Sequence, residues 1–457
     1  MSDPKSTTRR TFLRESGRFG TGVALTAWTA ARSRAAGVAP SDRLRLAVVG
    51  IRGRGGYLAQ QFASRPDCEV AYLCDVDESL FPIRTDAVEQ AQGAKPQTIT
   101  DFRHALDDKS IDAIIVATPD HWHALATIWG CQAGKDVYCE KPVSHSPWEG
   151  RKMVEAARKY DRIVQVGMQT RSGEYTKQAK AYIESGELGK LYLVRVINQK
   201  EWLNPAIVPS TEVPAGLNWD MWTGPAEMAA YNENLHRSWN HFWRFSGGDI
   251  INDAVHQMDP PRFLIGKPYP ETVYSTGGRY GKEGAFETPD TQVAVFQYDD
   301  LVMTFDLTLD TPYMIKSDQE LRDSDTMYPY WMQNAERIEL YGSKGLMLFG
   351  RHGAGWQVYD RPRSRNPVVA SQANGPFPDP EHFQNFCDSV RNRTLPNADI
   401  EEGHRSTFLC QAANISYRLG GRKLEGDGST EPFKGDPEAN SMLKREYRGP
   451  WIVPEVV

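Results

Sequence analysis

A glycine-rich turn between an apolar strand and a helix restricts the possible folds of this chain more than any other feature. Residues 44–49 form an apolar run typical of a buried strand, and residues 50–56 form the turn. Residues 57–64 have the pattern of a helix, and residues 69–74 form a second apolar run that ends at Asp75. The order strand, glycine turn, helix, strand, acid is typical of a dinucleotide-binding βαβ unit. The sequence therefore predicts a Rossmann domain.

The turn is predicted to bind a pyrophosphate, because glycines let the backbone approach closely and the next helix points its N-terminus at the anion. The G-x-G-x-x-G pattern, placed at residues 50–55, puts Arg52 where the second glycine belongs, so a plain tight turn is the alternative. Asp75 follows Gly55 by 20 residues, a spacing that suits ribose hydroxyls. The acidic residues after Asp75 favour NAD, with NADP as the alternative. The predicted cofactor-binding residues of this unit are Gly50, Ile51, Arg52, Gly53, Arg54 and Asp75.

Lys141 lies at the end of another predicted strand. Residues 136–139 form a short apolar run, and Pro142 cannot continue a sheet ladder, so the strand ends at Lys141. Open α/β sheets bind ligands outside the carboxyl ends of their strands. Lys141 and Glu140 are therefore predicted to contact the cofactor, and an ordinary exposed loop lysine is the alternative.

Two further strand ends carry polar residues. Residues 111–117 form a buried strand that is followed by a predicted helix over 121–133, and residues 163–167 form another strand. Capping or surface histidines are the alternative to a functional role at the first of these ends. The residues predicted to bind cofactor are Thr118, Pro119, His121, His123 and Gln169, and Arg171 is predicted to bind substrate.

Length and composition exclude several classes of protein. A chain of 457 residues is too long for one core, so two domains are expected. The net charge is −6, and no basic stretch is interleaved with aromatic residues, which argues against a nucleic-acid partner. The six cysteines show no zinc-binding spacing, so no metal site is predicted.

Residues 1–36 resemble an export signal. Residues 8–14 contain a twin-arginine pair, Arg9-Arg10, and residues 19–31 form a weakly apolar run that is too short to span a membrane. We expect a Tat signal that is removed, and a periplasmic or otherwise exported protein without a stable membrane span. A disordered basic N-terminus is the alternative.

The chain after residue 175 has the pattern of a sheet. Residues 192–199, 272–278, 291–298, 302–309 and 337–341 alternate or run apolar, which predicts an open, mostly antiparallel sheet. Residues 361–378 are predicted to form a polar loop, and residues 381–391 and 403–419 are predicted to form helices that return to the first domain. The long segment 201–246 is rich in tryptophan and histidine and is interpreted as a binding loop, with plain loop packing as the alternative. Its predicted substrate contacts are Trp239, His241 and Arg244.

These motifs together resemble the Gfo/Idh/MocA family of oxidoreductases. The resemblance rests on the glycine turn, on ATPDHWH at 117–123 and CEKP at 139–142, and on residues 185–190, 247–259, 381–383 and 402–406. It implies a Rossmann domain with a doubly wound parallel sheet (41–174), an α+β substrate and oligomerisation domain (175–375), and C-terminal helices (376–457). It also implies a sugar or polyol dehydrogenase that uses NAD or NADP, and a homo-oligomer, dimer or tetramer, formed through the open sheet.

The expected catalytic residues are Lys141, His256 and Asn252. On a continuous helix Asn252, His256 and Asp259 would share one face, although Pro260 and Pro261 must kink or end that helix. The resemblance implies an aspartate at position 252 that assists His256, but this chain has Asn252, which cannot take a proton. The acid–base role then falls on His256 and Lys141, and Asn252 and His256 are also expected to bind substrate.

Two other functions stay open. Some relatives are glycosidases that use NAD for transient oxidation, but their Tyr-Pro-Thr-His-Gly pattern is absent from this sequence. A carbohydrate-binding protein without catalysis is suggested by Asn252 alone, because a fold does not determine a function.

Overall fold

The computed structural model describes residues 42–201, 209–281, 286–361 and 367–457. The predicted export signal lies outside these ranges, as do residues 202–208 of the predicted binding loop. None of the helices described is both long and apolar enough to cross a membrane.

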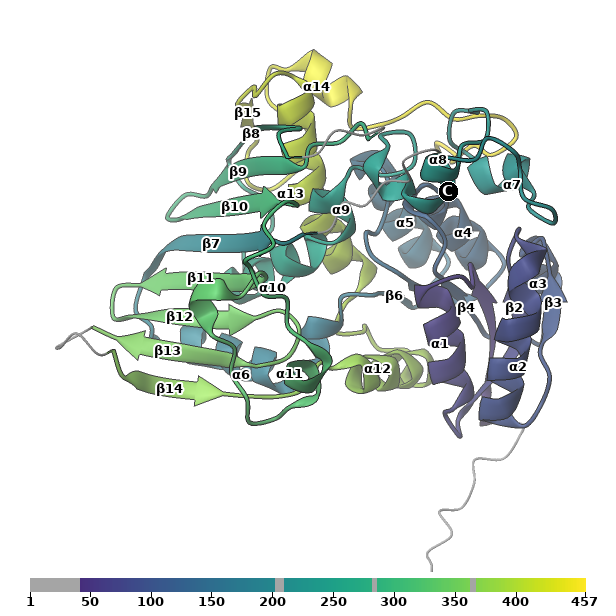
Figure 1. The fold of residues 1–457 in the computed structure, drawn as a ribbon, viewed down its shortest axis with the longest axis horizontal. Coiled ribbons are helices and arrows are strands. Elements are labelled where there is room, and N and C mark those ends of the chain that lie inside the picture. Colours follow the sequence, from purple (N-terminus) through teal and green to yellow (C-terminus); the bar gives the residue numbers. More distant parts are fainter. Residues whose placement is uncertain (1–41, 202–208, 282–285, 362–366) are drawn as a thin grey trace, which may run out of the picture. The chain divides into compact units, whose positions relative to one another are not determined.

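Six parallel strands form the first sheet, in the order β3-β2-β1-β4-β5-β6 (Figure 1). β4 and β5 are buried along their whole length, as expected for strands covered by helices on both faces. The predicted Rossmann sheet is thus confirmed. Its strands are β1 (Leu44–Val49), β2 (Cys68–Cys74), β3 (Gln97–Ile99), β4 (Ala113–Val116), β5 (Asp136–Cys139) and β6 (Val164–Val166). Its helices are α1 (Arg54–Ala63), α2 (Phe81–Gln92), α3 (Arg103–Asp107), α4 (Asp120–Gln132) and α5 (Pro147–Lys159).

The direction of strand addition reverses between β1 and β4. The chain adds β2 and β3 on one side of β1, and then returns to place β4 and β5 on the other side. Doubly wound sheets bind ligands in the crevice outside the carboxyl ends of their strands at such a reversal. The loops that follow β1, β2, β4 and β5 therefore meet at one edge of the sheet.

Nine strands form the second sheet, in the order β14-β13-β12-β11-β7-β10-β9-β8-β15. Only the pair β7 and β10 is parallel among the strands described, which confirms the predicted open, mostly antiparallel sheet. β14 occupies part of the predicted polar loop, because its residues pair with β13 instead of facing water. The strands are β7 (Leu191–Gln199), β8 (Thr272–Gly278), β9 (Thr291–Gln297), β10 (Val302–Thr308), β11 (Arg337–Gly342), β12 (Gly345–Gly350), β13 (Trp356–Asp360), β14 (Val369–Ala373) and β15 (Leu424–Glu425).

Helices cover one face of the second sheet. Along β10, Met303 and Phe305 are buried, whereas Val302 and Thr304, which alternate with them, are partly exposed. The buried face packs against α6 (Glu174–Glu184), α10 (Val255–Ile265) and α13 (Ile400–Arg418). The remaining helices are α7 (Trp219–Thr223), α8 (Glu233–Arg237), α9 (Asp249–Asn252), α11 (Gln319–Asp323), α12 (Asp379–Asn392) and α14 (Pro437–Ser441).

The C-terminal helix α12 packs against the first sheet, beside α1 (Figure 1). The ring of Phe386 meets Phe62 of α1 edge-on at 6.1 Å and Tyr138 of β5 at 5.7 Å. α13 instead lies between α5 and α10. The last part of the chain therefore holds the two sheets in one compact unit.

The segment around His256 is not the continuous helix on which Asn252, His256 and Asp259 would share one face. α9 ends at Asn252, and α10 begins at Val255, so Asn252 and His256 belong to two helices. α10 continues through Pro260 and Pro261 to Ile265, so of the two expected effects of the prolines, a kink or an end, the helix does not end there. Both prolines are buried, and packing of the helix compensates for the two backbone hydrogen bonds that proline cannot make.

Candidate active site

A cavity of about 400 Å³ lies at the carboxyl ends of the first sheet's strands, where the strand order reverses. Its walls come from the glycine turn, from the ends of β2, β4 and β5, from the segment containing α7 and α8, and from α9. The lining residues are Val49, Gly50, Arg52, Gly53, Arg54, Cys74, Asp75, Val76, Asp77, Thr100, Phe102, Ala117, Thr118, Pro119, Asp120, Trp122, Glu140, Lys141, Met221, Trp222, His236, Trp239 and Asn252.

The glycine turn has the geometry of a phosphate cradle. Gly50 has φ +81°, and a Cβ on it would come within 2.7 Å of the Ala117 carbonyl oxygen. A Cβ on Gly55 would come within 1.7 Å of the Gly50 carbonyl oxygen, so both positions require glycine. A Cβ on Gly53 would meet nothing within 4 Å, and Gly53 is the N-cap of α1 without a side-chain cap bond. The free backbone N–H groups of α1 therefore suit an anion at this point.

Acidic residues form the wall beyond the turn. Asp75 accepts hydrogen bonds from the backbone N–H groups of Ile51 at 2.8 Å and Asp77 at 3.0 Å. Burial raises the pKa of Asp75 above its usual value. Arg52, in the place of the second glycine, forms an ion pair with Asp77 and is thereby held at this wall. The wall suits ribose hydroxyls and disfavours a further phosphate.

Arg54 has its charge neutralised inside the protein. It binds Glu140 at 2.9 Å and Asp379 of α12 at 2.8 Å. Gln169 lies behind this pair, 3.2 Å from the Tyr138 hydroxyl, and does not line the cavity. Glu140 and Arg54 therefore shape the cavity wall and join it to the C-terminal helix.

Lys141 and Asn252 meet at the opposite wall. The Lys141 ammonium donates a hydrogen bond to the Asn252 backbone carbonyl at 2.6 Å. Both residues line the cavity, and Trp239 lies on the same lining. The end of β5 and the end of α9 thus form one polar surface.

His256 lies next to this wall but does not line the cavity. Its ring centroid is 6.4 Å from that of His352. Burial, together with the positive charges of Arg351 and Lys141, lowers the pKa of His256 well below its usual value. Asp253 opposes this shift, but its carboxylate is already bound to Arg351 at 2.8 Å. His256 is therefore a neutral imidazole and a weak base in this structure.

The two histidines after β4 hold backbone carbonyls instead of lining the cavity. His121 Nε2 lies 2.9 Å from the Trp222 carbonyl oxygen, and burial lowers the pKa of His121 to about 3. His123 lies between the carbonyl oxygens of Pro142 at 2.6 Å and Thr118 at 2.9 Å. The neighbouring Thr118 and Pro119 do line the cavity.

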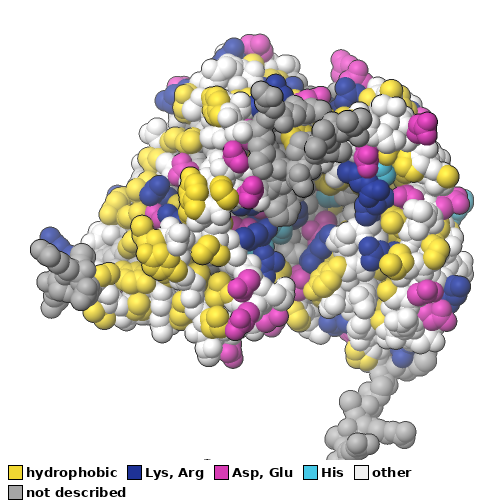
Figure 2. Space-filling model, viewed as in Figure 1, with side chains coloured by type: hydrophobic (Ala, Val, Ile, Leu, Met, Phe, Trp, Pro, Cys, Tyr) yellow, Lys and Arg dark blue, Asp and Glu magenta, His cyan; other side chains and the backbone are white. Residues whose placement is uncertain are grey.

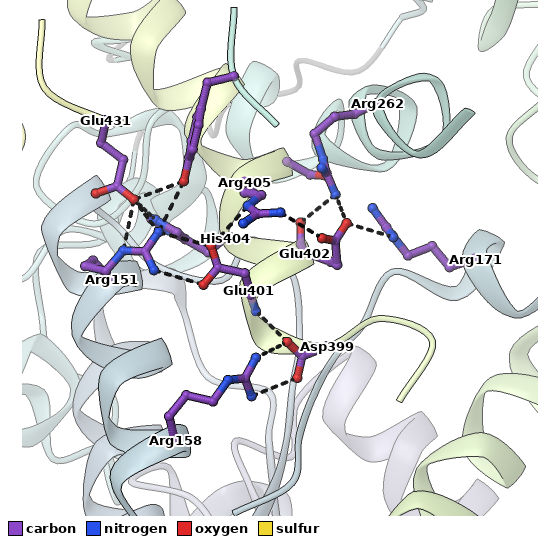
Figure 3. Close-up of polar contacts among 12 residues, drawn as sticks. Arg151, Arg158, Arg171, Arg262, Asp399, Glu401, Glu402, His404, Arg405 and Glu431 are labelled. Carbon is purple, nitrogen blue, oxygen red and sulfur yellow. Dashed lines mark hydrogen bonds and ion pairs between the residues drawn. The ribbon is translucent and has the colours of Figure 1, made fainter. Parts of the chain in front are cut away.

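Arg171 belongs to a cluster of ion pairs at the start of α13, away from the cavity (Figure 3). It is buried and binds Asp259 at 2.8 Å and Glu402 at 3.3 Å. His241 packs against Phe286 with ring centroids 4.8 Å apart, and burial lowers its pKa to about 4. Arg244 lies over the Glu227 side chain, 4.0 Å away. The structure therefore brings Trp239, but not these three predicted substrate residues, to the cavity.

Asp120 is a cavity residue that the sequence analysis did not select. It is the first residue of α4, its side chain is 1% exposed, and its carboxylate accepts a hydrogen bond from the Ser246 hydroxyl. Burial raises the pKa of Asp120 to about 7. Its position at the start of α4, four residues after the β4 strand end, was the available signal.

The six cysteines are buried free thiols. Cys68 and Cys387 lie with their sulfur atoms 3.6 Å apart, and with Asp67 they offer three ligand atoms within 4.8 Å of one another. Asp67, however, already binds Arg65 and Arg391.

Two family models match the chain. "Oxidoreductase family, NAD-binding Rossmann fold" matches residues 44–168, and "Oxidoreductase family, C-terminal alpha/beta domain" matches residues 213–421. Both describe Gfo/Idh/MocA proteins, and together they span well over half of the chain.

Individual relatives agree with the family models. Myo-inositol 2-dehydrogenase of Thermotoga maritima is 24% identical over 82% of this chain and 96% of its own length. D-glucoside 3-dehydrogenase of Escherichia coli is 24% identical over 51% of this chain and 57% of its own. The WlbA dehydrogenase of Bordetella pertussis, solved with NADH and UDP-GlcNAcA, shares the fold with a TM-score of 0.59 at 23% identity, covering 84% of this chain and 99% of its own. The chain belongs to the Gfo/Idh/MocA family of oxidoreductases, with an NAD-binding Rossmann domain followed by the family's C-terminal α/β domain.

Proposed function

We propose that this protein is an NAD-dependent oxidoreductase that transfers hydride between the cofactor and a secondary hydroxyl of a sugar, polyol or glycoside. The observation that carries the proposal is the single cavity that joins the glycine turn to Lys141 and Asn252. Relatives that act on myo-inositol and on a D-glucoside support this substrate class.

The residues present fit a dinucleotide. The open space at Gly53 and the uncapped start of α1 suit the pyrophosphate, and Asp75 suits the ribose hydroxyls. When bound, NAD supplies the hydride acceptor, which no side chain can provide.

Lys141 is proposed to hold the oxygen of the reacting hydroxyl. One of its three N–H donors is bound by the Asn252 carbonyl, which directs the ammonium group toward α9 and leaves donors for a ligand. A fixed cation beside the oxygen stabilises negative charge that develops as the hydroxyl loses its proton. The Asn252 side chain is proposed to bind a neighbouring hydroxyl.

The wall from the α7–α8 segment suits a sugar. Trp222 and Trp239 line the cavity together with His236, whose pKa burial lowers to about 4. Sugars offer apolar C–H faces that pack on aromatic rings and hydroxyls that bind polar side chains.

The test is NADH absorbance after NAD and a panel of sugars, polyols and glycosides are added to the purified protein. We expect NADH to accumulate with at least one of them. Release of a glycosidic leaving group without net NADH would identify a glycosidase instead, and binding without either product would identify a carbohydrate-binding protein.

We also propose that the free face of the second sheet pairs with a second copy of the chain. Hydrophobic side chains gather over these strands (Figure 2), and Tyr192, Tyr330 and Met332 are 52%, 70% and 69% exposed. Light scattering should give a dimer or larger for the wild type and a smaller mass for Tyr192→Glu combined with Met332→Glu. An unchanged mass would argue against this face.

Export through the Tat pathway is proposed from Arg9 and Arg10 in residues 1–36. Replacing both with lysine should leave the protein in the cytoplasm of an expressing bacterium. Undiminished periplasmic yield would contradict the signal.

A further inference from the structure

Oxidation of a hydroxyl requires a group that takes the proton, and the expected groups are poorly suited to this role. Asn252 has no carboxylate, and His256 is a weak base because burial and two cations lower its pKa. The base is therefore expected among the other carboxylates that line the cavity.

Four carboxyl groups line the cavity, and three are already bound. Asp75 accepts two backbone N–H groups, and Asp77 and Glu140 each form an ion pair with an arginine. Asp120 has no arginine or lysine ion partner within the described part of the chain. It lines the same cavity as Lys141 and Asn252.

We propose that Asp120 is the catalytic base of this enzyme, in place of the side chain at position 252, and that Ser246 is its positioning residue. The proposal rests on the proposed oxidoreductase function. Asp120 begins α4, which follows β4, whereas position 252 ends α9, so the carboxylate would reach the same cavity from the cofactor domain.

Ser246 connects Asp120 to the second domain. Its hydroxyl donates to the Asp120 carboxylate from the segment that leads to Gly248 and α9. This hydrogen bond orients the carboxylate toward the element that carries Asn252. Because the hydroxyl donates to the carboxylate, it also favours the ionised form and lowers the pKa of Asp120 against the effect of burial.

The surroundings of Asp120 keep it able to gain and lose a proton near neutral pH. Burial raises its pKa to about 7, while the Ser246 hydrogen bond and then the Lys141 ammonium oppose the rise. The other titratable neighbours are Cys139 on β5, whose pKa burial raises, and His121, whose pKa burial lowers to about 3, so both are uncharged. A general base works best when its pKa is close to the working pH.

The substrate O–H bond breaks and its proton passes to an Asp120 carboxylate oxygen, while Lys141 holds the substrate oxygen. As the C–O bond becomes C=O, the hydride would leave the carbon with its electron pair, and NAD, when bound, would supply the two-electron acceptor. In the reverse direction Asp120 returns the proton.

The test compares Asp120→Asn with Asp136→Asn. Asp136 is also a buried aspartate whose pKa burial raises, but it lies at the other end of β5, paired with Arg393, and outside the cavity. Asp120→Asn should lower kcat by about 10²–10⁴-fold, the range for a positioned acid–base group. NADH fluorescence titration should give a Kd within about twofold of wild type for Asp120→Asn. Asp136→Asn should keep wild-type kcat.

Three further measurements separate catalysis from structure. Infrared difference spectra between acid and alkaline pH should contain a carboxylic-acid band that titrates near pH 7 in the wild type and in Asp136→Asn, but not in Asp120→Asn. In a plot of kcat against pH, Ser246→Ala should shift the acid limb without removing it. Adding Asn252→Asp to Asp120→Asn should restore part of kcat.

The outcomes are distinguishable. If the wild type reduces no NAD with any substrate, the proposed function fails. If the wild type is active but Asp120→Asn is folded and keeps both its kcat and the acid limb, the assignment of Asp120 is wrong while the function stands.

Discussion

The ammonium group of Lys141 donates a hydrogen bond to the backbone carbonyl of Asn252, 2.6 Å away. The two residues are 111 positions apart, one at the end of β5 and the other at the end of α9. This bond joins the cofactor domain to the second domain at the wall of the cavity. Lys141 therefore contacts both domains.

Replacing Lys141 should impair both the reaction and cofactor binding. Lys141→Ala should lower kcat by about 10²–10⁴-fold and weaken NAD binding, because the side chain lies on the cofactor side. His256→Ala should keep NAD affinity closer to that of the wild type, because His256 does not line the cavity. Steady-state kinetics and NADH fluorescence measure both effects. Lys152→Ala, a partly buried lysine of α5 that pairs with Glu155 outside the cavity, is the control, and full activity of Lys141→Ala would place the chemistry elsewhere.

Two glycine substitutions should separate folding from cofactor binding. Gly55→Ala puts a Cβ 1.7 Å from the Gly50 carbonyl oxygen, so it should distort the turn and lower the melting temperature. Gly53→Ala meets no protein atom within 4 Å, so the fold should be unchanged while the new methyl group weakens NAD binding. Thermal melts and NAD titration measure the two effects. Equal NAD affinity of Gly53→Ala and wild type would show that the pyrophosphate lies elsewhere.

NAD should bind more tightly than NADP. Asp75 and Asp77 form an acidic wall that repels a 2′-phosphate, and Arg52 is already paired with Asp77. Fluorescence titration with both reduced cofactors gives the ratio. Asp77→Ala releases Arg52 and should therefore reduce the ratio of NAD affinity to NADP affinity. Tighter NADP binding by the wild type would contradict the proposal that the acidic wall repels a 2′-phosphate.

Asp120→Asn should stabilise the protein at alkaline pH. The pKa of Asp120 is raised to about 7 in the folded protein, so the folded state binds a proton that the unfolded chain releases at about pH 4. The contribution of Asp120 to the free energy of unfolding is therefore fully present below about pH 4 and is lost as the pH rises to about 7. Each pKa unit is worth about 1.4 kcal/mol, so the loss is on the order of a few kcal/mol.

Melting temperatures of wild type and Asp120→Asn across pH 4 to 9 test this expectation. The variant should melt higher at pH 8 and close to the wild type at pH 4. Asp136→Asn is the control, because Asp136 is also a buried aspartate. Its substitution removes the ion pair with Arg393, so this variant should not melt higher than the wild type at pH 8. A lower melting temperature of Asp120→Asn at pH 8 would mean that the ionised carboxylate stabilises the fold.

Much of the first domain was predictable because its signals are local. The apolar strands, the glycine turn and the acid after β2 lie within about 30 consecutive residues, and the structure places them as expected. Lys141 was found for the same reason, since Pro142 ends the strand beside it. The family motifs then led to the second sheet, although β14 was mistaken for a loop.

The sequence by itself determined the Rossmann unit and the strand-end position of Lys141, because each depends on neighbouring residues, and the family resemblance showed Asn252 where an aspartate is implied. Only the tertiary structure decided which polar groups share the cavity. Arg171 forms an ion pair with Asp259, and His121 and His123 contact backbone carbonyls. Asp120 accepts a hydrogen bond from the Ser246 hydroxyl. Burial and ion pairing with partners far along the chain set the charge of each group, and neither can be read from local sequence.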